Sequence, residues 1–310
     1  MNGVLPEGPH GTVITVGSFD GVHLGHRAVL DEIARRARAA GRRSVLVTFE
    51  PHPLMVVNPA AAPPVLTTGP ERREILAQTD LDYAVFLRFD RHLAAMGPED
   101  FVRGVLRRRY HMRELVIGHD HGFGRGRSGD VDTLRRMGES DGFAVDVVAA
   151  VGDHGFPVSS TKIRRAIAGG DLATARRLLG RPYKVSAMVT RGAGRGRQLG
   201  IPTANMDAVP AEKLLPPDGV YAVRVEWPGG RTGGMMNQGG KPTFGDGRRS
   251  LEVHLFDFEG DLYGRWISVE WVTRLRDVRS FDSAGHLARQ LEMDRATARK
   301  ALAAGGDRRE

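Results

Sequence analysis

Short apolar runs alternate with amphipathic stretches along the first half of the chain. The runs have the length of buried strands, and between them the apolar residues recur at helical spacing. The expected strands are Thr12–Val16, Ser44–Phe49, Tyr83–Leu87, Glu114–Ile117 and Ala144–Ala149, and the expected helices cover residues 26–40, 69–79, 97–109 and 130–139. This alternation predicts an α/β fold, a Rossmann-like parallel sheet with helices on both faces.

The pattern changes after residue 181. Just before it, Asp171 is expected to cap a short helix over Leu172–Leu179 that ends at Gly180, and another short helix covers Lys162–Ala168. Beyond it, period-two alternation and Gly/Pro turns predict an antiparallel β-barrel or sandwich with strands Lys184–Thr190, Val220–Glu226, Thr232–Met236, Ser250–Phe258 and Trp266–Leu275. We expect Asp282 or Ser283 to begin a closing helix and Asp294 to begin a last one. The sequence thus predicts two domains, residues 1–181 and 182–310.

Composition narrows the class of protein. The 310 residues suffice for two cores, 41% of them are apolar, and the sequence contains no cysteine. The missing cysteines exclude disulfides, thiolate catalysis and cysteine-ligated zinc. No apolar run approaches the roughly 20 residues of a membrane-spanning helix, and no secretory signal is visible. We therefore expect a cytoplasmic protein without a membrane partner.

The charge balance leaves the partner open. With 45 Lys and Arg against 37 Asp and Glu, the formal net charge is +8. Such a bias can serve nucleic acid, an anionic surface or phosphorylated small molecules. Most of the excess is arginine on ordinary helical patterns, so we favour a solvated basic face over a nucleic-acid site.

The most informative segment joins the first strand to the first helix. It places Gly17, Phe19, Asp20, Gly21, His23, Gly25 and His26 between Val16 and the amphipathic stretch. A helix start offers free N–H groups and a partial positive charge, which suit phosphate. His23 and His26 are three residues apart and share a helix face. The segment predicts a triphosphate site, although histidines in such turns are also often structural.

Other polar segments are expected at the same crevice, because ligands bind beyond the carboxyl ends of parallel strands. His52 follows the second strand in a Pro-rich turn, and residues 118–121 follow another strand. Ser159, Ser160 and Thr161 begin a helix whose hydroxyls and N–H groups can bind phosphate, and Arg164 can clamp phosphate bidentately. Simple helix capping is the alternative for these hydroxyls.

Taken together, the GxFDGxHxGH, TFxPHP and SSTxIR segments resemble prokaryotic FAD synthetases, which belong to the nucleotidylyltransferase superfamily. The resemblance implies adenylyl transfer from ATP to FMN without a covalent intermediate. It implies catalytic roles for His23, His26 and Arg164, and an ATP site made by Gly17, Phe19, Asp20, Gly21, Gly25, His52, Ser159, Ser160 and Thr161. It places flavin contacts at Asp120, His121 and Phe123, with His121 standing where the family has Phe.

A second dense motif, Gly-rich with arginines, runs from Arg191 to Asn205. It lacks the P-loop and dinucleotide fingerprints, and a short RGG-like nucleic-acid segment is an alternative. Followed by NQGGKPTF, LEVH and DLYG, it resembles riboflavin kinases. The resemblance implies ATP binding by Gly192, Gly194, Gly196, Arg197, Thr203 and Asn205, with Mg²⁺ on Thr203 and Asn205.

Within that second motif set, Glu252 is the candidate general base for the ribityl hydroxyl of riboflavin. Strand alternation puts Leu251, Val253 and Leu255 on one face and Glu252 and His254 on the other. An outward, solvated Glu252 is the alternative. Gln238 stands where the family has an aliphatic residue.

The resemblance covers residues 13–302 and implies a bifunctional enzyme, a riboflavin kinase and FMN adenylyltransferase. Its expected small-molecule partners are ATP, riboflavin, FMN and FAD, with Mg²⁺ accompanying ATP and no tightly bound prosthetic group. The oligomeric state stays open. One alternative is a paralogue with one inactive half or a flavin-analogue substrate, motivated by His121 and Gln238. A non-enzymatic nucleotide or RNA binder would not need the intact catalytic motifs.

Overall fold

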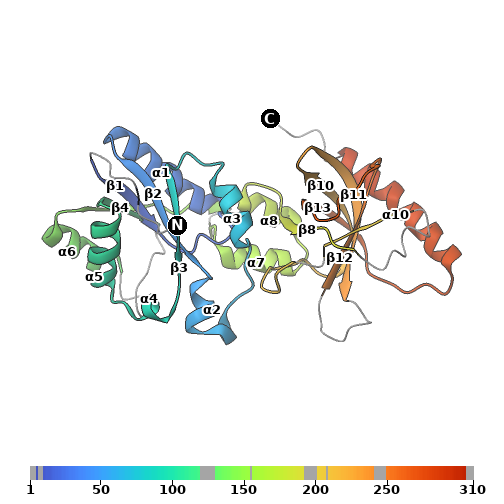
Figure 1. Ribbon diagram of the computed structural model, residues 1–310, viewed down its shortest axis with the longest axis horizontal. Helices are drawn as coiled ribbons and strands as arrows, with labels where there is room; N and C mark the ends of the chain where they lie inside the picture. Colours follow the sequence, from blue (N-terminus) through green and yellow to red (C-terminus); the bar gives the residue numbers. More distant parts are fainter. Residues whose placement is uncertain are drawn as a thin grey trace. The chain divides into compact units, whose positions relative to one another are not determined.

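The computed structural model describes residues 5, 10–118, 130–153, 156–191, 201–206, 209–240 and 249–304. The chain divides into two compact units, Met1–Lys162 and Ile163–Glu310, each built on its own sheet (Figure 1). No helix within the described ranges is long and apolar enough to cross a membrane.

The first unit is built on a parallel sheet in the order β3-β2-β1-β4-β5. All five predicted strands are confirmed, as β1 (Thr12–Val16), β2 (Arg43–Glu50), β3 (Tyr83–Arg88), β4 (Met112–Gly118) and β5 (Ala144–Val148). The strand order reverses between β1 and β4, and ligands of such sheets bind beyond the carboxyl ends at this switch point. The segment after β1 therefore begins at the place where a ligand site is expected.

Helices cover both faces of this sheet, as predicted. They are α1 (Leu24–Ala39), α2 (Pro53–Val57), the 3₁₀ turn η1 (Pro59–Ala61), α3 (Gly69–Leu76), α4 (Arg91–Ala95), α5 (Pro98–Asp100), the π-helix η2 (Phe101–Arg109) and α6 (Val131–Asp141), and a short hairpin pairs β6 (Gly152–Asp153) with β7 (Phe156–Pro157). Residues such as Val13 and Leu46 pack with α1 and α3. Their neighbours Ile14 and Val45 pack with η2 and α6. Burial on both faces explains why the strands are almost continuously apolar.

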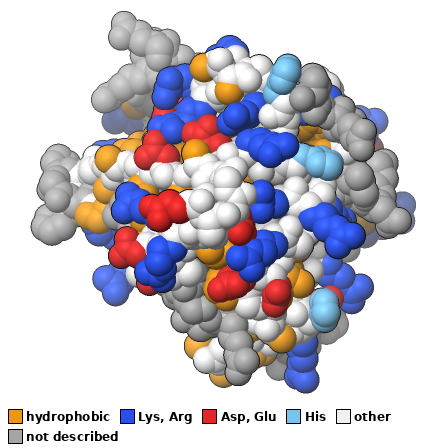
Figure 2. Space-filling model, turned by 90° about the vertical axis from the view of Figure 1, so that its left-hand side faces the viewer, with side chains coloured by type: hydrophobic (Ala, Val, Ile, Leu, Met, Phe, Trp, Pro, Cys, Tyr) orange, Lys and Arg blue, Asp and Glu red, His pale blue; other side chains and the backbone are white. Residues whose placement is uncertain are grey.

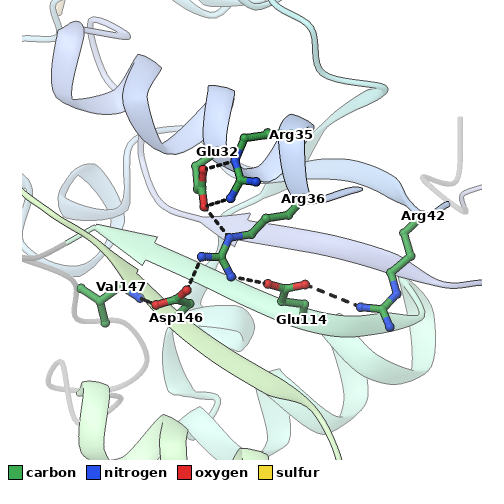
Figure 3. A network of polar contacts seen from close by, with 7 residues as sticks. All are labelled: Glu32, Arg35, Arg36, Arg42, Glu114, Asp146 and Val147. Atoms are coloured by element: carbon green, nitrogen blue, oxygen red, sulfur yellow. Dashed lines mark hydrogen bonds and ion pairs between the residues drawn. The ribbon is translucent and has the colours of Figure 1, made fainter. Parts of the chain in front are cut away.

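A charged network fixes α1 over β4 and β5 (Figure 3). The guanidinium of Arg36 donates to Glu114 Oε1 at 2.7 Å and to Glu32 Oε1 at 2.6 Å, and it also pairs with Asp146. The hydrogen bond to Glu114, ahead of those to Glu32 and Asp146, raises the pKa of Arg36. Because α1 is held at this end, the position of its N-terminus above the sheet edge is also restricted.

Basic side chains on the surface are accompanied by acidic ones. Figure 2 shows a face on which Lys and Arg are interspersed with Asp and Glu. Among the described residues, Arg103 pairs with Glu99 and Asp141, and Arg107 lies 3.7 Å from Asp141. These contacts neutralise part of the basic charge on this surface.

The second unit contains an antiparallel sheet in the order β8-β13-β10-β11-β12-β9. Its strands are β8 (Lys184–Met188), β9 (Ala204–Asn205), β10 (Gly219–Trp227), β11 (Gly230–Gly240), β12 (Arg249–Leu255) and β13 (Trp266–Arg276). Thr190, just beyond β8, forms a β-bridge with Asn205 of β9, and its N–H donates to the Asn205 carbonyl oxygen at 2.9 Å. The chain just beyond β8, at one end of the sheet order, thus contacts β9 at the other end, and this closes the sheet toward the predicted barrel.

Two short helices precede this barrel, α7 (Ser160–Ala168) and α8 (Leu172–Leu179). Asp171 caps α8 by accepting from Thr174 N–H at 2.9 Å, and Gly180 ends it with a φ of 70°, as predicted. The domain boundary after residue 181 stays a prediction.

The end of the chain differs from the expectation of two helices. The described part forms one helix, α10 (Ala284–Ala304), and Ser283 accepts from His286 N–H at its start. The expectation that Asp294 begins a separate helix is wrong. Asp294 is 4% exposed in the middle of α10 and accepts from Nε and Nη2 of Arg276. Its carboxylate therefore joins the helix to the end of β13 instead of capping a new helix.

Candidate functional site

The two histidines of the first motif lie against each other at the start of α1. His23 is the N-cap residue, and its Nδ1 accepts from His26 N–H at 3.2 Å. The two rings stack with centroids 3.6 Å apart, and Phe19 packs 4.6 Å from the His26 ring. Because Nδ1 of His23 accepts, a neutral ring carries its proton on Nε2. His23 can then donate from Nε2 to an anion.

Two glycines of the motif make room for these rings. A Cβ on Gly25 would lie 3.2 Å from the His23 ring and 3.6 Å from the Val158 carbonyl oxygen. A Cβ on Gly17 would lie 3.1 Å from the Phe19 ring. Both distances to the rings are tighter than ordinary contacts, so a side chain at either position would displace an aromatic ring. Glycine at these two positions therefore allows the rings to pack closely against the backbone.

The start of α7 lies beside the same turn. Ser160 Oγ donates to the Asp20 carbonyl oxygen at 3.0 Å, and Ser159 Oγ accepts from Lys162 N–H at 3.4 Å. Thr161 is exposed at the helix start. Sequence positions 140 residues apart are therefore brought together, as predicted from the motifs. Arg164 lies further along α7, beyond the division between the units, and its role stays a prediction.

Asp20 and His52 have contacts that the sequence did not suggest. Asp20 is 1% exposed and its carboxylate accepts from the backbone N–H groups of Leu66 and Thr67. His52 caps α2 by accepting from Leu54 N–H at 3.3 Å. In both cases the side chain has a structural partner.

In the second unit, three polar residues stand in a row across neighbouring strands. Glu252 of β12 is paired with Asn205 of β9 on one side and with Asn237 of β11 on the other. Directly paired residues project from the same face of a sheet. Glu252 is half-buried and Asn205 is 5% exposed. The predicted base and one predicted metal-ligating residue, Asn205, are thereby neighbours. Asn237 lies on the other side of Glu252, which only the strand register shows.

His254 holds the segment before β9. Its Nδ1–H donates to the Pro202 carbonyl oxygen at 2.9 Å, and the residue is 8% exposed. Burial lowers the pKa of His254, which keeps the ring neutral. Thr203 lies next to this anchored carbonyl group, so His254 supports the predicted ATP segment.

An open surface pocket of about 680 Å³ lies between the segment after β13 and α10. Its lining includes the apolar side chains of Phe281 and Met293 and the cationic side chains of Arg279 and Arg289. A Cβ on Gly239 of β11 would lie 3.5 Å from Val278, in the same segment. Gly239 is two residues beyond Asn237, which places this segment near the row around Glu252.

Family models match both units. One described as FAD synthetase matches residues 5–162, and one described as riboflavin kinase matches residues 179–302. A bifunctional riboflavin kinase/FMN adenylyltransferase from Escherichia coli (strain K12) is 38% identical over 299 residues, 96% of this chain and 95% of the relative. One from Pseudomonas fluorescens is 39% identical over 305 residues, 98% and 96% of the two chains. The chain belongs to the family of bifunctional riboflavin kinases/FMN adenylyltransferases.

A solved structure is similar over the same extent. A crystal structure described as a macrolide-efflux protein from Streptococcus pneumoniae gives a TM-score of 0.83 at 31% identity. The match covers 94% of this chain and 95% of that chain. The family and fold class expected from the sequence are confirmed.

Gln238, which stands where the resemblance implies an aliphatic residue, lies in the barrel core and is hydrogen-bonded there. The residue is 0% exposed. Its Nε2 donates to the Pro216 carbonyl oxygen at 2.5 Å, and its Oε1 accepts from Trp271 Nε1–H at 3.2 Å. The amide thus satisfies two buried polar groups that an aliphatic residue would leave unpaired. These contacts give Gln238 a structural role in the barrel core.

Several predicted site residues of this family member lie outside the described residues. They are Asp120, His121 and Phe123 on the flavin side of the first site, and Gly192, Gly194, Gly196 and Arg197 in the Gly-rich segment of the second. Their roles stay predictions. Gly118, which leads to the first group, ends β4 at the switch point of the sheet.

Proposed function

We propose that this chain phosphorylates riboflavin to FMN in residues 182–310 and adenylylates FMN to FAD in residues 1–181. The observation that carries the proposal is the match of relatives with both activities in their names to 96% and 98% of the chain. His23 and His26 of the first candidate site belong to one compact unit, and Glu252 of the second belongs to the other. We expect a cytoplasmic enzyme that uses ATP for both reactions.

The first reaction site acts by positioning and charge stabilisation. A phosphate oxygen of FMN attacks the α-phosphorus of ATP, the bond to the β-phosphate oxygen breaks, and pyrophosphate leaves. His23 donates from Nε2 to the phosphates at the N-terminus of α1, where the helix dipole favours negative charge. His26 stacks behind it, and Arg164 clamps the phosphates. No group on the protein becomes covalently attached.

The second site works through Glu252. Its carboxylate takes the proton of the ribityl hydroxyl of riboflavin while the hydroxyl oxygen attacks the γ-phosphorus of ATP, and ADP leaves. Asn205, paired with Glu252, and Thr203, two residues before Asn205, have side-chain oxygen atoms, a type of donor that fits Mg²⁺. Bound with ATP, Mg²⁺ would neutralise phosphate charge. Asn205 and Asn237, which flank Glu252, give its carboxylate polar neighbours on the same face of the sheet.

The flavin ring of this kinase site would occupy the pocket beside α10. The pocket is open to solvent on one side, so the ring would lie against it and stay partly exposed. Phe281 and Met293 provide apolar and polarizable surface for a planar aromatic ring, and Arg279 and Arg289 provide donors for its carbonyl oxygens.

Two substitutions test the division of labour. His26→Ala should abolish FAD formation and leave FMN formation from riboflavin. Glu252→Ala should stop FMN formation and leave FAD formation from supplied FMN. Both are followed by separating FMN from FAD after incubation with ATP and Mg²⁺. The matched controls His92→Ala and Glu226→Ala replace exposed residues of the same types and should change neither reaction.

The loss of both activities in either folded variant would contradict the two-site proposal. The same assay on the unaltered protein decides the alternative of one inactive half. FMN that accumulates without FAD would show that the first site is inactive. FAD from supplied FMN, without FMN from riboflavin, would show the same for the second.

A further inference from the structure

Residues 66–72 precede and begin α3, and they contact the turn between β1 and α1 that carries His23. We call these residues the brace. Asp20 Oδ2 accepts from Leu66 N–H at 2.9 Å, and Oδ1 accepts from Thr67 N–H at 2.9 Å and from Thr67 Oγ1–H at 3.1 Å. Thr67 Oγ1 in turn accepts from Gly21 N–H at 3.0 Å. One threonine hydroxyl therefore binds both the side chain and the backbone of the turn.

Arg72, at the other end of the brace, joins the ends of two strands. The residue is 5% exposed, and its guanidinium donates to the Ser18 carbonyl oxygen at 2.6 Å and to the Phe49 carbonyl oxygen at 2.7 Å. Ser18 follows β1 and Phe49 is near the end of β2. Burial lowers the pKa of Arg72, against the charge of Asp20. A buried guanidinium with two carbonyl partners fixes the distance between these strand ends.

The brace is itself rigidly held. Thr68 caps α3 by accepting from Glu71 N–H, and the Glu71 carboxylate accepts from Thr68 N–H at 2.9 Å. This capping box is 7% exposed at Thr68 and 1% exposed at Glu71. Two reciprocal bonds at a buried helix start leave the preceding residues little freedom.

The turn that the brace holds is strained. Phe19 and Val22 have φ values of 46° and 38°, in the left-handed region that non-glycine residues rarely adopt. Such residues persist only where the surroundings fix them, and they gather at functional sites. Phe19 packs on His26, and Val22 directly precedes His23. Relaxation of the strained turn would therefore move both histidines.

We propose that the brace is a positioning element for adenylyl transfer, in which Thr67 and Asp20 hold His23 and His26 in their reactive arrangement. This rests on the proposed function of the first site. Asp20 is then a positioning residue and not a phosphate contact. Its carboxylate is buried against N–H and O–H donors of the protein, and a negative charge beside a triphosphate would repel it. Ser160, which donates to the Asp20 carbonyl oxygen, connects the start of α7 to the same element.

The test compares two substitutions of one residue. Thr67→Val keeps the shape of the side chain and removes the hydroxyl, whereas Thr67→Ser keeps the hydroxyl. We expect Thr67→Val to lower kcat for FAD formation about 100-fold, because misplacement of catalytic groups by about 1 Å has effects of this size. The KM for ATP should change much less than kcat. Thr67→Ser should retain most of the activity, and both variants should phosphorylate riboflavin at the rate of the unaltered protein.

A merely structural brace gives a different result. Thr67→Val would then lower the melting temperature of the first domain but keep kcat at a temperature where it is folded, which would overturn the proposal. If Thr67→Val does not fold, Asp20→Asn replaces it. For a positioning role Asp20→Asn lowers kcat, whereas a lower KM for ATP with unchanged kcat would show that Asp20 acts on the phosphates directly. Absence of FAD formation by the unaltered protein would instead refute the proposed function.

Discussion

Replacement of Gln238 by leucine tests how the second domain accommodates its departure from the family pattern. The change keeps the approximate size of the side chain and removes both amide groups. The Pro216 carbonyl oxygen and the Trp271 indole N–H then lose their partners in a position that is 0% exposed. The Pro217 carbonyl oxygen, 3.3 Å from Nε2, is weakly affected. We expect lower stability and unchanged flavin kinetics.

The magnitude follows from the two groups left without partners. Each buried unsatisfied donor or acceptor costs about 1–3 kcal/mol. The added apolar burial of leucine offsets roughly 1 kcal/mol of this. Two groups of average cost lose about 4 kcal/mol, so after this offset the expected loss in the free energy of unfolding is about 2–4 kcal/mol. For a domain of this size that loss lowers the melting temperature by roughly 6–15 °C.

The assay uses tryptophan fluorescence during urea unfolding. All three tryptophans, Trp227, Trp266 and Trp271, lie in the second domain, so the signal reports on that domain alone. A double-mutant cycle with Trp271→Phe isolates the indole contact, because the cost of Gln238→Leu should shrink by about 1 kcal/mol or more when no indole N–H remains. Equal costs of Gln238→Leu in both backgrounds, or an altered KM for riboflavin, would refute the reasoning.

Two further predictions concern the second domain. Asp294→Ala should lower the free energy of unfolding by about 3–5 kcal/mol, because it leaves the Arg276 guanidinium, 12% exposed, without its carboxylate partner. The control Asp277→Ala breaks an exposed ion pair and should cost less than about 1 kcal/mol in the same urea titration. Equal costs of the two substitutions would contradict this prediction. Burial lowers the pKa of His254, so the unfolded chain binds a proton that the folded chain does not. Stability should therefore fall as the pH drops below about 6.5, the pKa of an unperturbed histidine. His254→Asn, which retains a donor for the Pro202 carbonyl oxygen, should flatten this slope, and an unchanged slope would exclude His254 as its source.

Local patterns predicted the elements with the strongest periodicity. The five strands of the parallel sheet follow from apolar runs, and α8 follows from its Asp171 cap and Gly180 terminus. The prediction failed at Asp294, where an acidic residue resembled a helix start. Its partner Arg276 lies 18 residues away, on another element, and sequence periodicity does not contain that pairing.

The sequence by itself determined the family and the fold class, and it supplied the predicted site residues, because motifs and periodicity are local properties of the chain. Only the tertiary structure decided what those residues contact. It placed Glu252 between two asparagines through strand register, and it buried Gln238 against Trp271. It also stacked His23 and His26 at the start of α1, whereas it bound the Asp20 carboxylate to Thr67. Hydrogen bonds between distant segments set these arrangements, and they form only when the chain has folded.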